Sequence, residues 1–287
     1  NEKKINENKT NEEVRFGKVS TSEDVNEIAD NGAFVRQKNR FTTPFGNGEG
    51  ELPVEAGRYR LIWTSLCPWA TRQVIAFKLL GLEDVISVGK VAPVRTDNGW
   101  EFSLDEGGVD PVLKIKYLPE IYAETDPEYT GRATVPTIVD LKTRKVVNND
   151  YHKLTNYWET VWKPFHKEGA PDLYPEELRD EIDKLNEVIF NEVNNGVYKA
   201  GFAKTQEQYE LNYNLVFNRL DQLEEHYLGE YDPYKKMEMP DTVTEFTHVK
   251  GAYPYAYPGG GYETVKGYIS TKALEENPLI SPEEALS

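Results

Sequence analysis

The stretch from Arg58 to Val91 most constrains the fold, because a strand, a helix and a second strand follow one another through short connections. Residues 58–63, RYRLIW, alternate polar and apolar side chains, which is typical of a strand. Pro68 suits the first turn of a helix and Gly81 suits its end, so the sequence predicts a helix between them. DVISVGKV predicts the next strand. We therefore expect a β-α-β unit.

The chain's only cysteine, Cys67, lies directly before Pro68 and so at the predicted start of this helix. Unpaired N–H groups and the positive end of the helix dipole favour a thiolate there. We expect a reactive thiol with a lowered pKa; the alternative is a small buried apolar side chain. A single cysteine excludes an intrachain disulfide and a cysteine-rich zinc site, and it predicts a cytoplasmic location.

A β-hairpin is predicted by TVPTIVDLKTRKVVNND, in which TIVD and KVVN flank a polar turn. Val135 and Pro136 precede the first of these strands. A cis bond between them would offer backbone groups to a peptide-like ligand. Together with the β-α-β unit this gives a thioredoxin-like layout. Because CPWA replaces C-x-x-C, a mixed disulfide at Cys67 needs an external thiol to release it.

The chain divides into four parts by composition and periodicity. Residues 1–30 lack periodicity and predict a disordered N-terminal tail, and residues 31–168 predict an irregular arm followed by the thioredoxin-like domain. Residues 172–228 repeat apolar side chains at steps of three and four, which predicts a helical C-terminal domain. Residues 229–287 are rich in Tyr, Pro and Gly and predict a coil-rich extension. The expected fold class is α/β plus all-α.

Within these parts, three further elements are expected. The stretch from about residue 92 to residue 133 predicts an irregular insertion, and YHKLTNYWETVW predicts the helix that closes the first domain. NNGVYKAGF predicts a break between two helices, and Thr205 with Gln208 predicts a capping box at the start of the second.

The net charge of -16 and the pI of about 4.8 exclude nucleic acid and anionic membranes as expected partners, because both bind basic surfaces. The mean hydropathy is -0.66, and no apolar run approaches the ~18 to 20 residues that a membrane span needs. The four histidines do not show the spacing of metal ligands, so no metal site is expected.

Several stretches resemble one family, the glutathionyl-hydroquinone reductases, also called xi-class glutathione transferases. CPWA, VPTIVD and NNGVYKAGFA occur together in order, and the similarity runs from about Phe34 to Leu228. The resemblance implies a thioredoxin-like N-terminal domain, a helical glutathione-transferase C-terminal domain and a homodimer. It also implies reductive deglutathionylation of glutathionyl-hydroquinones, with glutathione or a related low-molecular-weight thiol as cosubstrate and a small-molecule quinol as product.

The resemblance assigns roles to individual residues as well. Cys67 matches the catalytic cysteine, and Tyr198 matches a tyrosine that faces the quinol pocket. Trp100 and Val135 match positions that contact glutathione, with Pro136 completing the turn beside Val135. Pattern alone would leave Trp100 and Tyr198 as plain core aromatics.

Two stretches depart from the family. Asp150 and Tyr151 stand where Glu and Ser usually hold the γ-glutamyl end of glutathione. This substitution predicts weaker glutathione use and some preference for a shorter thiol such as γ-glutamylcysteine; the alternative is that the Tyr151 hydroxyl replaces that of Ser. After Leu228 the usual helices are not found, so either the helical domain is shortened or a stretch that contains them is absent from the sequence. These departures motivate a second functional hypothesis, a ligand-binding or regulatory protein with weak turnover.

Overall fold

The computed structural model describes residues 16–21 and 27–230, with side chains as far as residue 223. The chain forms two compact units, Asn1–Val216 and Phe217–Ser287. The description below concerns the first unit, apart from the bounds of the last helix. The predicted C-terminal extension lies outside the described residues except for its first two positions.

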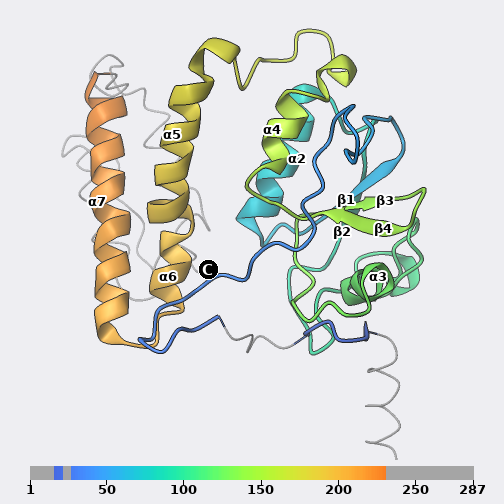
Figure 1. Cartoon of the computed structure of the whole chain (residues 1–287), viewed down its shortest axis with the longest axis horizontal. Helices are drawn as coiled ribbons and strands as arrows, with labels where there is room; N and C mark the ends of the chain where they lie inside the picture. The colour runs from blue at the N-terminus through green and yellow to red at the C-terminus, as the bar shows by residue number, and fades with distance from the viewer. Residues whose placement is uncertain (1–15, 22–26, 231–287) are drawn as a thin grey trace, which may run out of the picture. The chain divides into compact units, whose positions relative to one another are not determined.

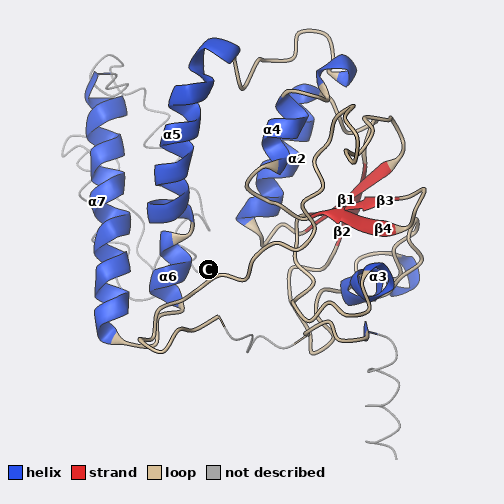
Figure 2. Ribbon diagram, in the orientation of Figure 1, coloured by secondary structure: helices blue, strands red, loops and turns tan. Residues whose placement is uncertain are grey.

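A four-stranded sheet forms the centre of the first unit (Figure 2). Its strands lie in the order β2-β1-β3-β4. Strand β1 pairs parallel to β2 and antiparallel to β3, and β3 pairs antiparallel to β4. The predicted β-α-β unit and the predicted hairpin are therefore confirmed. The strands span Tyr59–Trp63 (β1), Ser87–Lys90 (β2), Thr137–Asp140 (β3) and Lys145–Asn148 (β4).

Helices cover both faces of this sheet (Figure 1). On one face, α2 (Pro68–Leu80) and α4 (Leu154–Glu159) pack against the strands through a core that includes Leu61, Phe77 and Trp158. On the other face, α3 (Leu118–Thr125) packs through a core that includes Ile62 and Tyr122. Neighbouring strand residues point to opposite faces, so Leu61 and Ile62 enter different cores.

Helix α2 begins and ends where the sequence predicts. Pro68 occupies the first helical position, where an N–H would have no partner within the helix, so the lack of one costs no hydrogen bond. Gly81 closes the helix with φ 77°, and its N–H donates to the carbonyl oxygen of Phe77 at 2.8 Å. A left-handed residue of this kind is the usual end of a helix, and glycine adopts it without a steric penalty.

The stretch expected to be an irregular insertion contains two helical segments, which corrects that prediction. They are the short 3₁₀ turn η1 (Glu106–Gly108) and helix α3. The Glu120 carboxylate accepts the backbone N–H of Tyr117 at 2.8 Å and so caps α3. Leu118, Ile121 and Tyr122 are fully buried. The Pro-rich and Tyr-rich composition of this stretch hides the helical spacing of these three residues.

Part of the predicted N-terminal tail is folded. Phe16 and Val19 are buried, and the Ser20 N–H donates to the carbonyl oxygen of Gly131 at 3.0 Å. The Glu27 carboxylate pairs with Arg132. Residues 16–21 and 27–30 therefore belong to the body of the molecule, because their few apolar and charged side chains find partners far along the sequence.

From Glu176 onward the described chain is almost wholly helical, as predicted. The predicted break at NNGVYKAGF lies later than expected, because the backbone passes through one π-helical turn and continues as a helix to Gly201, and the break before the next helix falls at residues 202–205. The Asn195 N–H donates to the carbonyl oxygen of Phe190, five residues earlier. The elements are η2 (Lys163–Phe165), η3 (Glu176–Leu178), α5 (Arg179–Ile189), η4 (Phe190–Asn194), α6 (Gly196–Gly201) and α7 (Gln206–Glu230).

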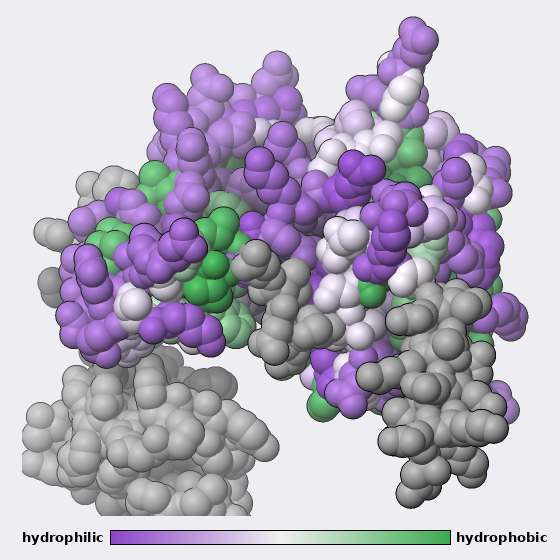
Figure 3. Space-filling view, turned by 60° about the horizontal axis from the view of Figure 1, so that its bottom comes forward, coloured by the Kyte–Doolittle hydropathy of each residue, from purple (hydrophilic) through white to green (hydrophobic). Residues whose placement is uncertain are grey.

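These helices are less buried than the sheet and its covering helices. Helix α5 has no fully buried residue, and α6 has only Gly196. Val197, Phe202 and Leu211 are each about half exposed, and apolar side chains are visible on this part of the surface (Figure 3). Thr205 caps α7 by accepting the Gln208 N–H at 3.4 Å, so this half of the predicted capping box is confirmed.

Candidate active site

Cys67 lies at the N-cap of α2, directly after the loop that follows β1. Its backbone is extended, and its carbonyl oxygen accepts the N–H of Thr71 at 2.9 Å, which closes the first helical turn. The side chain is half-buried and makes no disulfide. A thiol at this position faces the unpaired amides of the helix start.

The Val135–Pro136 peptide bond lies next to this thiol. The bond is cis, as the hypothesis for this turn required. The Cys67 thiol donates to the carbonyl oxygen of Val135, with Sγ and O 3.4 Å apart. Residues 68 positions apart in the sequence are thus brought together by the pairing of β1 with β3.

The pKa of Cys67 is raised, which corrects the expectation of a lowered one. Burial raises it most, while the backbone N–H groups of Ala70 and Trp69 and the positive charge of Arg36 lower it. The helix start thus acts in the predicted direction, but it is outweighed by the removal of the thiol from water. In this structure the resting form of Cys67 is the neutral thiol.

An aromatic cluster surrounds the first turn of α2. Its centre is the Trp69 indole, whose ring centroid lies 4.7 Å from that of Tyr151, 5.5 Å from that of Phe190 and 6.4 Å from that of Tyr198. The Tyr198 ring in turn stacks on Phe202 at 6.3 Å. These aromatic side chains join the thioredoxin-like part to the helices that follow it.

Tyr198 belongs to the same site as Cys67. Burial raises the pKa of its hydroxyl, and the nearby Cys67 adds to this effect, while Arg36 and Trp69 oppose it. At neutral pH the Tyr198 hydroxyl is therefore protonated and able to donate a hydrogen bond. The structure brings together Cys67, Val135, Pro136 and Tyr198 of the predicted site residues.

No family model matches this chain. It is 40% identical over 203 residues to the glutathionyl-hydroquinone reductase YqjG of Escherichia coli, which covers 68% of this chain and 62% of the relative. A solved glutathione transferase Xi 1 from Trametes versicolor is 38% identical with a TM-score of 0.61, and the match covers 68% of each chain. The chain belongs to the xi-class glutathione transferases.

The xi transferase ECM4 of Saccharomyces cerevisiae, solved in complex with glutathione, is a further structural relative. It is 30% identical, with a TM-score of 0.64, and the match covers 76% of this chain and 72% of that one. The chain spans 62 to 63% of the length of the first curated relatives that it matches. The predicted fold class, a thioredoxin-like domain followed by a helical glutathione-transferase domain, is confirmed by these structures and by the described sheet.

Two of the residues expected to hold the thiol in this xi-class transferase have other neighbours. Trp100 packs on the core beneath α3, with the Arg95 guanidinium 5.6 Å from its ring centroid. The Asp150 carboxylate accepts the Asn39 amide and the Lys153 N–H, at 3.5 and 3.4 Å. Neither contact involves Cys67.

Tyr151 turns its ring into the aromatic cluster. The ring contacts both Trp69 and Phe190, with centroid distances of 4.7 and 6.2 Å, and the Tyr151 carbonyl oxygen accepts the Gln73 side-chain amide at 3.3 Å. Gln73 is fully buried and also accepts the Trp158 indole N–H at 2.7 Å, so it holds α2 against α4 and the residues before it. The large side chain at position 151 thus extends the aromatic wall of the site.

Sequence reasoning missed Arg36, which lies on the arm before β1. Its guanidinium carbon is 4.4 Å from the centroid of the Tyr198 ring, and its Nε donates to the Asn195 side chain at 2.8 Å. A single arginine in an irregular segment carries no local signal. Only the path of the arm across the site shows that this charge lies near Cys67.

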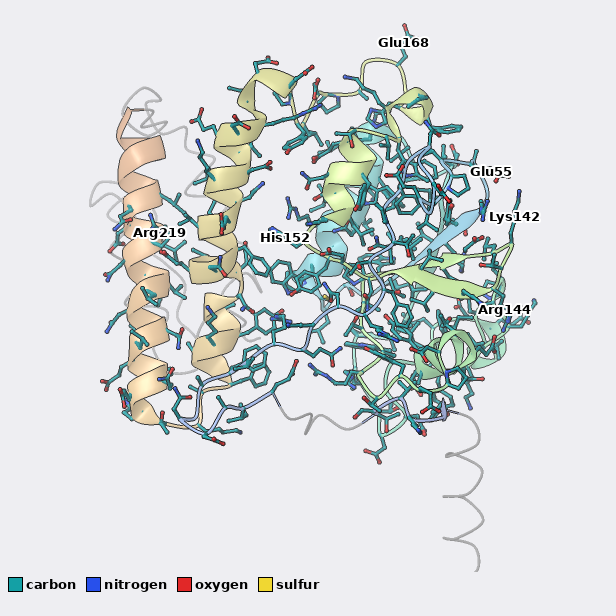
Figure 4. All side chains as sticks on the ribbon, viewed as in Figure 1. Glu55, Lys142, Arg144, His152, Glu168 and Arg219 are labelled. Atoms are coloured by element: carbon teal, nitrogen blue, oxygen red, sulfur yellow. The ribbon has the colours of Figure 1, made fainter. Side chains whose placement is uncertain are left out.

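A cavity of about 530 Å³ lies between the start of α4 and α5. His152, which Figure 4 labels, and Phe190 are among its lining residues, and their ring centroids lie 4.5 Å apart. Burial lowers the pKa of His152, and Arg72 lowers it further. Among the described residues no cluster of metal-ligating side chains is found, and no described helix is long and apolar enough to cross a membrane.

Proposed function

We propose that this xi-class transferase removes glutathione reductively from glutathionyl-hydroquinones through a mixed disulfide at Cys67. The observation that carries the proposal is the position of the thiol, at a helix start and 3.4 Å from the carbonyl oxygen of a residue in a cis X-Pro bond. The names of relatives support it, since two curated relatives are glutathionyl-hydroquinone reductases.

In the proposed reaction the Cys67 thiol first loses its proton, and the amides of Trp69 and Ala70 stabilise the thiolate. The thiolate attacks the sulfur of the glutathionyl group. The substrate reacts as its keto tautomer, in which the ring carbon that bears sulfur already carries a proton. An S–S bond forms as the C–S bond breaks, and the electron pair of the C–S bond moves through the ring to the adjacent oxygen, so the fragment leaves as a phenolate that then takes up a proton. The products are the hydroquinone and a disulfide between Cys67 and glutathione. A second glutathione then releases Cys67 as oxidised glutathione forms.

The thiol peptide would be held beside Cys67 by the backbone at Val135 and Pro136, together with Trp100, Asp150 and Tyr151. The solved relative with bound glutathione supports glutathione as the thiol. The Tyr151 ring in the aromatic cluster supports neither of the two hypotheses for this position over the other. A cytoplasmic location and a homodimer remain predictions of the sequence.

A second candidate is a ligand-binding protein of the same fold with weak turnover. The raised pKa of Cys67 favours it, because a neutral thiol is a poor nucleophile. The two candidates differ in the rate of the chemical step and not in the fold.

The test has two arms that use the full chain. In the first, the protein is incubated with glutathione disulfide or γ-glutamylcystine, and adducts at Cys67 are detected by mass spectrometry. In the second, the glutathione conjugate of menadiol is supplied with glutathione, and release of menadiol is measured. We expect a glutathione adduct and catalytic turnover, both abolished in Cys67→Ser. An adduct without turnover would favour the ligand-binding protein, and turnover by Cys67→Ser would remove Cys67 from the mechanism.

A further inference from the structure

Gln73 is a fully buried amide in helix α2, next to the core residue Trp158. A buried amide is unfavourable unless its donors and its acceptor are paired. An apolar side chain of similar size would fill the same space without that requirement. The glutamine therefore contributes something that packing alone does not.

Both ends of the Gln73 amide have partners. The Nε2 amino group donates to the backbone carbonyl oxygen of Trp69 and to that of Tyr151, both at 3.3 Å. The Oε1 oxygen accepts the Trp158 indole N–H at 2.7 Å. These partners fix the orientation of the amide, because the reverse orientation would set its oxygen against two carbonyl oxygens and its NH₂ group against an indole donor.

The two carbonyl oxygens belong to segments that carry the two ends of the proposed thiol site. Trp69 is in the first turn of α2, two residues after Cys67. Tyr151 follows strand β4 and lies 78 positions from Gln73 in the sequence. The two segments are in contact, since the Trp69 and Tyr151 ring centroids lie 4.7 Å apart. One nitrogen atom thus ties the segment that carries the sulfur to the segment that is proposed to hold the γ-glutamyl end.

The distance between these two segments matters for a thiol that is held at both ends. The sulfur of glutathione must reach Cys67 while its γ-glutamyl carboxylate and ammonium groups contact another part of the site. A displacement of about 1 Å can slow a reaction about 100-fold, because the reacting atoms are no longer aligned. A small thiol compound without these groups contacts only the sulfur end, so its reaction does not depend on the distance.

We propose that Gln73 is a positioning residue that sets the distance between the two ends of the thiol site and so makes Cys67 selective for γ-glutamyl thiols. This inference rests on the proposed function and concerns only its thiol half. Gln73 acts through Trp69 and Tyr151 and does not touch the thiol itself, because its side chain is fully buried and its amide is already paired.

The test measures thiol–disulfide exchange at Cys67 with no quinol present. The Cys67 thiolate attacks one sulfur of an added disulfide, a mixed disulfide with the protein forms, and one thiol leaves. Two reagents are compared: glutathione disulfide, and bis(2-hydroxyethyl) disulfide, which has neither a carboxylate nor an ammonium group. The rate constant for each is measured by mass spectrometry of quenched samples of the full chain and its variants.

We expect the full chain to react faster with glutathione disulfide than with the small disulfide. Gln73→Met has a side chain of similar length without the amide, so it should slow the glutathione reaction about 10- to 100-fold and change the other less than about 3-fold. Gln73→Glu should lose selectivity in the same way. Its ionised carboxylate can accept the Trp158 N–H but cannot donate to the two carbonyl oxygens.

Trp158→Phe is the matched control. It removes the third hydrogen bond of the same amide at a fully buried position and leaves both Nε2 bonds in place. It should lower the urea midpoint of unfolding, as Gln73→Met does, and yet keep the ratio of the two rate constants. A ratio that falls equally in Trp158→Phe would mean that Gln73 acts only through the stability of the core, and the inference would be wrong.

Two other results overturn the inference. One is an unchanged ratio in both Gln73→Met and Gln73→Glu, and the other is a full chain that shows no preference for glutathione disulfide. A chain that gives the expected ratios but does not cleave the menadiol conjugate keeps this inference and contradicts only the proposed function.

Discussion

At the scale of the residue, the reactivity of Cys67 depends on two opposed effects. The helix start and Arg36 favour the thiolate, while burial favours the thiol and is the larger effect. We therefore expect the rate of Cys67 alkylation to rise through an inflection above the ~8.5 of a free cysteine. A raised pKa keeps the thiol protonated at neutral pH, so the alkylation rate increases only as the pH rises.

The measurement is iodoacetamide labelling of Cys67, the chain's only thiol, across a range of pH. Arg36→Met should move the inflection to still higher pH, because it removes the positive charge near sulfur, whereas Arg40→Met, at an exposed arginine of the same arm that pairs with Asp126, should not move it. An inflection below the free value in the wild-type chain would contradict the burial argument and restore the original expectation.

The position of Cys67 can be predicted from the local sequence, but its pKa cannot. The place of Cys67 at a helix start follows from Pro68 and Gly81, which lie near it in the chain. Its pKa depends on Arg36 and on burial by distant segments, and no pattern near residue 67 contains them.

At the scale of the element, predictions succeeded where hydrogen bonding is local or alternation is clear. The strands β1, β3 and β4 and helix α2 were found because alternating side chains and a proline-to-glycine frame mark them. Helix α3 was missed because only eight residues form it and its apolar side chains stand among Pro and Tyr. The π turn before α6 was missed because Gly196 is normally a helix breaker.

Glu159, the last residue of α4, makes the stability of the fold depend on pH. Burial raises the pKa of Glu159 to about 7, although Arg72 opposes the change. Between the unfolded value and about 7, the folded chain holds this proton and the unfolded chain does not. The free energy of unfolding therefore falls as pH rises through this window, and ionised Glu159 destabilises the fold above it.

Glu159→Gln removes this penalty. We expect it to raise the free energy of unfolding by about 1 to 3 kcal/mol at about pH 8 and by almost nothing at about pH 4. Urea denaturation of both chains at the two pH values measures the difference. Glu168→Gln, at an exposed carboxyl that Figure 4 labels, is the control, and its effect on the free energy of unfolding should be the same at both pH values. A benefit of Glu159→Gln that is equal at both pH values would point to packing and not to ionisation.

At the scale of the whole molecule, the proposed reaction uses residues from two parts of the first unit, the thioredoxin-like part and the helices that follow it. The thioredoxin-like part supplies Cys67 and Val135, which are hydrogen-bonded to each other and which the proposed function assigns to glutathione. The helices that follow supply Tyr198, and the arm brings Arg36 to its ring. The sequence predicted both parts and the irregular arm, but not the contacts that the arm makes, because contacts such as that of Arg36 with Asn195 link positions 159 residues apart.

This division predicts that the two half-reactions respond differently to Tyr198→Phe. The aromatic ring remains to stack on Trp69, so the site keeps its shape, but a hydrogen bond to the developing phenolate is lost. Cleavage of the menadiol conjugate should slow by on the order of 10² to 10³, as for a lost oxyanion donor. Formation of the glutathione adduct at Cys67 involves no aromatic fragment and should be almost unchanged. Rapid mixing with each substrate separately measures both rates. Equal slowing of the two would mean that Tyr198 supports the geometry of Cys67 and makes no contact with the quinol.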